Sequence, residues 1–163
     1  MRYQMRQKLL SFGDDYKIKD EAGNDVYYVD GKVFSIGDKL SFQDMQGSEI
    51  ARIRQRVLAL GKTYEIEHAG HTTIIHKHIF TLLNCKFSVD VPGPDDFEAK
   101  GNLLDMEYEF VDTRGHRIAE VSKRWFRLAD TYGIEIASGQ DDVLILCCAV
   151  VIDLCCHGDK RLR

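Results

Sequence analysis

The sequence predicts a mainly β protein of the α+β class. We expect a duplicated, closed antiparallel β-barrel of about 12 strands around a buried hydrophobic C-terminal helix. Two observations predict this architecture. Short β-like runs separated by turn residues fill the chain up to about residue 140, and their pattern recurs about 68 positions later. A continuous apolar segment, residues 143–156, then follows.

The first half of the chain has the sequence pattern of an antiparallel meander. Runs of about five residues, rich in β-branched and aromatic side chains, alternate with turn residues. The clearest hairpin has Ala69-Gly70 between two alternating runs. The predicted strands cover residues 16–20, 26–29, 40–44, 50–53, 64–68 and 71–75.

An internal repeat organises the chain. Residues 42–53, FQDMQGSEIARI, align with residues 110–121, FVDTRGHRIAEV, and residues 64–67 align with 132–135 at the same offset. We therefore predict one domain, residues 1–163, with repeats at about 14–68 and 85–136 and a helix at about 142–157. A single curved sheet would leave exposed edges, whereas two copies can close on each other. A barrel of that size needs something to fill it.

The apolar segment supplies this filling. It is apolar on nearly every side if helical, so it is buried in protein or in lipid, and a buried strand is the third alternative. Asp141 and Asp142 suit a helix start, and His157-Gly158 suits a helix end. Fourteen helical residues span roughly 21 Å, short of the ~30 Å hydrocarbon core, and Asp153 adds a penalty in lipid. A helix inside the barrel is therefore favoured.

Composition narrows the functional classes. The formal net charge of −4 argues against a nucleic-acid binder. The charged start of the chain has no apolar core of a signal peptide, so we expect a cytoplasmic protein, with a peripheral membrane location as the alternative. Four of the five cysteines form two adjacent pairs within the helix, where they suit small buried hydrophobes better than disulfides or metal ligands. No cofactor is expected.

Basic side chains form the candidate binding site. Arg52, Arg54 and Arg56 alternate along one strand face, and arginine forks suit a lipid phosphate or another anion. The alternative is a solvated outer face or a barrel rim. The duplicate strand and the C-terminal tail offer further cations: Lys123, Arg124, Arg127, Lys160, Arg161 and Arg163.

Four clustered histidines do not predict a metal site. His68 and His71 would face each other across the hairpin, whereas His76 and His78 have the opposite parity and lie on the other face. Neither a nucleophile motif, a Walker loop nor a dinucleotide fingerprint is present in the sequence. We therefore expect no metal and no catalytic residue.

Two further positions have open interpretations. Asp153, inside an apolar helix, must be paired, protonated or near the barrel mouth. Pairing with a rim arginine is the simpler reading, and a proton or ligand role is the alternative. Trp125 and Phe126 stand beside basic residues. They anchor a strand to the core or, in the alternative, insert at a membrane interface.

The second repeat carries a recognisable signature. SKRWF at residues 122–126, DTYGIEI at 130–136 and the apolar segment from Asp142 to Asp153 resemble the LURP-one-related family. That family belongs to the tubby C-terminal-like superfamily, which includes the phospholipid scramblases. The resemblance implies a 12-stranded barrel around a hydrophobic helix. Tubby domains bind phosphoinositides through basic side chains, but no such residue maps onto a position here.

These observations favour a non-enzymatic binding or scaffold protein. It would recognise a phospholipid head group or a partner protein at the barrel rim, without nucleic acid and without a stable membrane span. One alternative is a scramblase-like protein whose C-terminal helix inserts into the membrane. Another is a carrier or enzyme with a small-molecule pocket between barrel and helix. Fold resemblance alone does not choose among them.

Overall fold

Twelve strands and one helix build the part of the chain that the structure describes. The computed structural model describes residues 1–7, 15–31, 37–59, 61–79, 85–125 and 131–157. The strands are β1 (Arg2–Gln7), β2 (Tyr16–Lys19), β3 (Asp25–Gly31), β4 (Lys39–Asp44), β5 (Glu49–Gln55), β6 (Thr63–His68), β7 (His71–Ile79), β8 (Cys85–Asp90), β9 (Phe97–Asn102), β10 (Glu107–Asp112), β11 (Arg117–Ser122) and β12 (Thr131–Ile136). The helix is α1 (Asp142–His157). The predicted fold class is confirmed.

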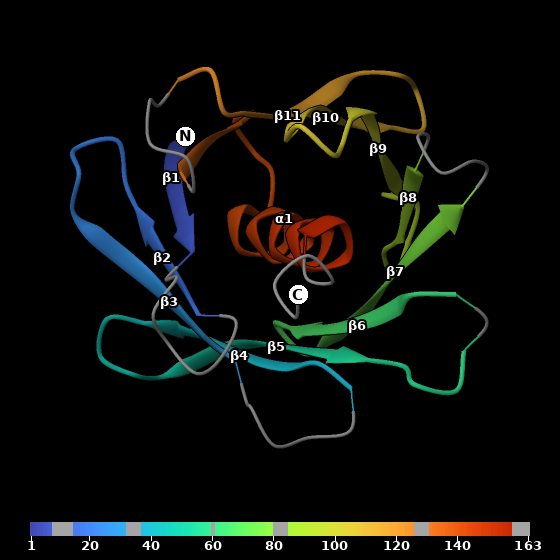
Figure 1. Ribbon diagram of the computed structural model, residues 1–163, viewed down its shortest axis with the longest axis horizontal. Helices are drawn as coiled ribbons and strands as arrows, with labels where there is room; N and C mark the ends of the chain where they lie inside the picture. The colour runs from blue at the N-terminus through green and yellow to red at the C-terminus, as the bar shows by residue number, and fades with distance from the viewer. Residues whose placement is uncertain (8–14, 32–36, 60, 80–84, 126–130, 158–163) are drawn as a thin grey trace.

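The sheet closes on itself. Each strand pairs antiparallel with the next along the chain, and β1 pairs with β12 to complete the ring around α1 (Figure 1). Closure leaves no strand edge to pair with another chain. Buried and exposed side chains alternate along strand β1: Tyr3 and Met5 face the core, whereas Arg2 and Arg6 are exposed.

Helix α1 fills the barrel. Every residue from Leu144 to Cys156 is buried, which is why a helix apolar on all sides is stable here without lipid. Asp141 caps its start: the side chain accepts from the Leu144 amide at 3.0 Å and the carbonyl from the Ile145 amide at 3.1 Å. Lys77 donates to the Cys155 carbonyl at 3.1 Å near its end. Within the described ranges no helix is long and apolar enough to cross a membrane.

The repeated motif has the same hydrogen bonds in both copies. The side chain of Asp44 accepts from two backbone amides of the β4–β5 turn, those of Gln46 and Ser48. That of Asp112 does the same in the β10–β11 turn. A register shift follows Phe42 in one copy and Phe110 in the other. The predicted repeats, residues 14–68 and 85–136, cover strands β2–β6 and β8–β12.

One end of the barrel carries the start of the helix. Because consecutive strands alternate in direction, the turns after β2, β4, β6, β8 and β10 all lie at the same end. Residues 137–141 lead from β12 into α1 at that end. We call this end the helix-start rim, and the cavities described below lie around it.

Candidate functional site

Of the arginines predicted on one strand face, Arg52 and Arg54 lie on the outer side of β5 and Arg56 directly follows this strand. All three form ion pairs with glutamates. Their exposed guanidinium groups form ion pairs along β5 and β6, which is the pattern of a solvated outer face. These pairs are Arg52–Glu49 at 2.5 Å, Arg54–Glu65 at 3.5 Å, Arg54–Glu67 and Arg56–Glu65 at 2.5 Å.

The other half of the predicted basic patch lies across the barrel. Lys123 and Arg124 follow β11, and five strands separate β11 from β5 in either direction around the ring. Arg124 approaches Glu107 at 3.6 Å. Duplication explains the separation, since equivalent positions of two halves that close on each other fall on opposite sides. The structure therefore does not bring the two groups together, and Arg127 and the C-terminal tail lie outside the described residues.

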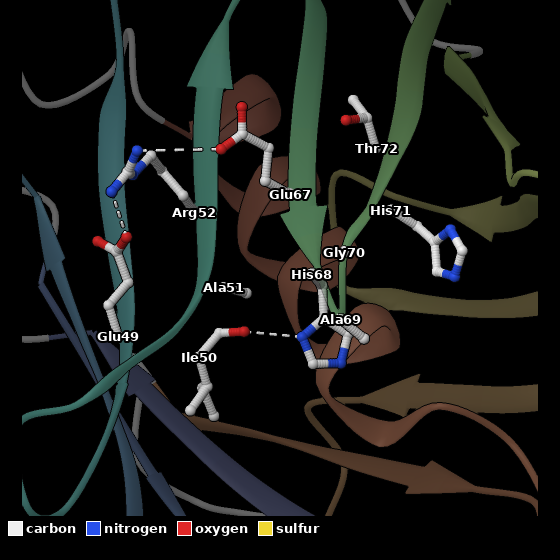
Figure 2. A pocket seen from close by; sticks show the side chains of 10 residues that line it. All are labelled: Glu49, Ile50, Ala51, Arg52, Glu67, His68, Ala69, Gly70, His71 and Thr72. Carbon is white, nitrogen blue, oxygen red and sulfur yellow. Dashed lines mark hydrogen bonds and ion pairs between the residues drawn. The ribbon is translucent and has the colours of Figure 1, made fainter.

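A cavity of about 400 Å³ lies beside the β6–β7 hairpin. Figure 2 shows Arg52 between Glu49 and Glu67 on one side of it and the hairpin on the other. His68 and His71 are direct cross-strand partners, as the sequence predicted, and Ala69 and Gly70 between them both have positive φ, 49° and 78°. The His71 side chain is exposed, whereas the His68 side chain is half-buried and points toward the start of the helix inside the barrel.

His68 links the barrel wall to the helix start. Its Nδ1 lies 2.8 Å from the Ile50 carbonyl oxygen, as drawn in Figure 2, and its Nε2 lies 3.3 Å from the Asp141 carboxylate. Beside it, the Tyr3 hydroxyl donates to Asp142 at 2.6 Å. Burial and this bond raise the pKa of Tyr3. The two acids therefore hold the first turn of α1 to the wall and offset the positive end of its dipole.

The other two histidines of this cluster lie next to hydroxyl groups on the opposite face of the sheet. His76 Nδ1 lies 3.1 Å from the Thr63 hydroxyl, and His78 Nε2 lies 2.8 Å from the Ser88 hydroxyl. Across the described residues, no group of three His, Cys, Asp or Glu side chains is placed to hold a metal ion.

The interior near the helix end contains polar groups. Tyr16 donates to the buried Asp153 at 2.8 Å, so a tyrosine of the wall is a partner of the carboxylate for which a rim arginine was predicted. The buried Tyr108 hydroxyl has no hydrogen-bonding partner in the part of the chain that the structure describes. The four helix cysteines are buried thiols, and burial raises the thiol pKa values of Cys148 and Cys155, the latter to about 12. Such thiols are poor nucleophiles.

The largest of the described cavities opens at the helix-start rim. It has a volume of about 670 Å³ and lies between the β8–β9 loop, the β10–β11 turn and the first turn of α1. Its lining combines buried apolar side chains, which we call its floor, with polar side chains. The floor consists of the buried side chains of Phe97, Ile118, Leu144 and Ile145. The polar lining consists of Asp95, Asp96, Asp112, Thr113, Arg114, Gln140 and Asp141.

A second cavity adjoins the first on the outer face of β8, β9 and β10. Its volume is about 620 Å³. The two cavities share five lining residues, so they lie next to each other at the rim. We call the two cavities together the rim groove. The shared residues are Asp96, Phe97, Asp112, Thr113 and Arg114.

Several carboxylates of the rim groove are held by neighbouring groups. The backbone amide of His116 is the main cause of the lowered pKa of Asp112. Lys100, followed by Lys86, lowers the pKa of Glu98. These acids therefore remain charged over the whole neutral range.

Two charged groups of the groove are left over. The exposed Asp95 carboxylate and the exposed Arg114 guanidinium have neither an ion pair nor a side-chain hydrogen bond to any other described residue. Sequence reasoning passed over both. The only available signal was the clustering of Asp95-Asp96 and Arg114 in predicted turns, and loops at a barrel mouth are common positions for ligand contacts.

Trp125 packs against the outside of the barrel. The Arg2 guanidinium lies over the Trp125 ring, and its central carbon is 5.3 Å from the ring centroid. Phe126 lies outside the described residues.

Comparison with known proteins identifies the family. The model of the LURP-one-related family matches residues 1–153. The chain belongs to the LURP-one-related family. YxjI, an uncharacterized protein of Bacillus subtilis (strain 168), is 30% identical over 156 residues, which cover 96% of this chain and 94% of YxjI.

A solved structure has the same fold. The X-ray structure of the Arabidopsis thaliana protein AT5G01750 matches with a TM-score of 0.66 over 93% of this chain and 90% of that chain, at 17% identity.

Proposed function

We propose that this protein is a binding module and that the rim groove is its binding site. One observation carries the proposal: two adjoining cavities of about 670 and 620 Å³ share a rim and combine an apolar floor with polar walls. Ligand sites have this composition, and barrel mouths are a frequent place for them. The family and fold support the same class of function.

The charges favour this site over the predicted basic patch. The arginines of β5 are neutralised by glutamates of β5 and β6, and Lys123 and Arg124 lie on the opposite side of the barrel. A phosphate would find no converging set of free cations among these described side chains. The groove, in contrast, has free polar groups above an apolar surface.

The duplication offers a matched test. Thr113 lines both cavities and is exposed in the β10–β11 turn; Met45 occupies the equivalent position of the β4–β5 turn, outside the groove. We expect Thr113→Trp to obstruct the groove and Met45→Trp to leave it open.

The assay is a screen of small molecules and short peptides, read by amide chemical shifts of the labelled protein. Ligands that shift amides around residues 91–97, 112–118 and 139–145, and that lose binding in Thr113→Trp but not in Met45→Trp, support the proposal. Ligands that map elsewhere, or that bind both variants equally, contradict it.

A further inference from the structure

The chemistry of the rim groove indicates what kind of partner it accepts. Acidic side chains outnumber basic ones along its lining, and this excess sets the sign of the local field. The acids are Asp90, Asp95, Asp96, Glu98, Asp112 and Asp141, and the bases are Lys100 and Arg114.

The start of α1 does not reverse this field. A helix N-terminus ordinarily attracts anions through its free amides and dipole. Here Asp141 already accepts from the Leu144 amide, and Asp142 occupies the first turn. The carboxylates at the mouth would therefore repel an anionic ligand such as a phosphate and attract a cation.

The dimensions favour a chain segment over a small molecule. A drug-sized ligand fills a pocket of about 300–1,000 Å³, and each half of the groove has that size by itself. The inner half has an apolar floor at Phe97 and Leu144, while the outer half runs along the strand face past Glu98 and Lys100. An extended segment that crosses the rim would place side chains in both halves.

We propose that the rim groove binds an extended segment of a partner protein in which a lysine or arginine stands next to an apolar side chain. The apolar side chain rests on the Phe97–Leu144 floor, and the cation meets Asp95, whose carboxylate has no partner among the described residues. Arg114 can pair with an acidic or C-terminal carboxylate at the other end of the segment. This inference rests on the proposed function and specifies its ligand.

The test uses the full chain and a phage-displayed library of random peptides. Asp95→Lys reverses the charge at one position of the groove, and Glu21→Lys makes the same change in the exposed β2–β3 turn, which four strands separate from the β8–β9 loop in either direction. Peptides selected on the wild type should be enriched in Lys or Arg beside an apolar residue. By fluorescence anisotropy, Asp95→Lys should weaken the best of them at least about fivefold and Glu21→Lys less than about twofold. Added salt should reduce the difference.

The outcomes separate the two proposals. Groove-binding peptides without basic residues, or equal losses in both charge variants, overturn the partner chemistry but leave the groove as a binding site. No enrichment relative to a selection on Thr113→Trp overturns the peptide partner, and the proposed function falls with it if the small-molecule screen also finds no ligand of the groove. Binding to phosphatidylserine vesicles that Arg114→Glu abolishes would identify a membrane, and not a peptide, as the occupant.

Discussion

Replacing Tyr16 with phenylalanine tests the polar contact between the barrel wall and its helix. The change removes the hydroxyl that donates to Asp153 at 2.8 Å, and the two side chains are 0% and 5% exposed. Removing a hydrogen-bond donor from a buried carboxylate costs about 1–3 kcal/mol. With an m-value of about 2 kcal/mol/M, the urea midpoint should fall by about 0.5–1.5 M.

Tyr108→Phe is the matched control. It also removes a hydroxyl from a buried tyrosine of the wall, but one without a hydrogen-bonding partner among the described residues. The free energy of unfolding should stay unchanged or rise by up to about 1 kcal/mol, because a desolvated hydroxyl is lost. Both variants can be measured by circular dichroism in urea. Equal losses in the two variants would refute the reasoning.

Three further predictions follow from the barrel. Gly101→Ala should lower the free energy of unfolding in urea by at least about 2 kcal/mol, because at φ +128° the added Cβ would lie 2.8 Å from the Glu107 carbonyl oxygen. Gly93→Ala, where the added Cβ would meet open space, should cost about 1 kcal/mol. Equal costs would contradict this. Asp44→Ala and Asp112→Ala should each cost about 1–2 kcal/mol, since each carboxylate accepts the same two turn amides; strongly unequal losses would show that the two turns are not equivalent. Burial raises the thiol pKa of Cys155 from 9.0 to about 12, so the folded state retains a proton that the unfolded state loses above about pH 9. The contribution of this buried thiol to the free energy of unfolding should be fully present below pH 9 and decrease as the pH rises toward 12. Urea unfolding at pH 8 and pH 10 measures the difference. Equal stability at the two pH values would argue against thiol burial.

Local patterns predicted most of the wall. Alternation identified β2 to β7, and the Ala69-Gly70 turn joined β6 to β7. Strand β1 was missed, although Tyr3 and Met5 alternate with exposed residues. The candidate site was much less predictable. Parity correctly placed Arg52 and Arg54 on one outer face, but it cannot say which carboxylates lie on the neighbouring strand.

The sequence by itself determined the duplication, the strand periodicity and the helix that must be buried. These follow from spacings of two and 3.6 residues and from a length too short for a bilayer. Only the tertiary structure decided that the equivalent basic groups stand on opposite sides of the ring, and that Asp95, Phe97, Arg114 and Leu144 meet at one rim. Closure of the barrel brings together the β8–β9 loop, the β10–β11 turn and the start of α1. No local pattern records that meeting, because it depends on strand register and curvature summed over the whole sheet.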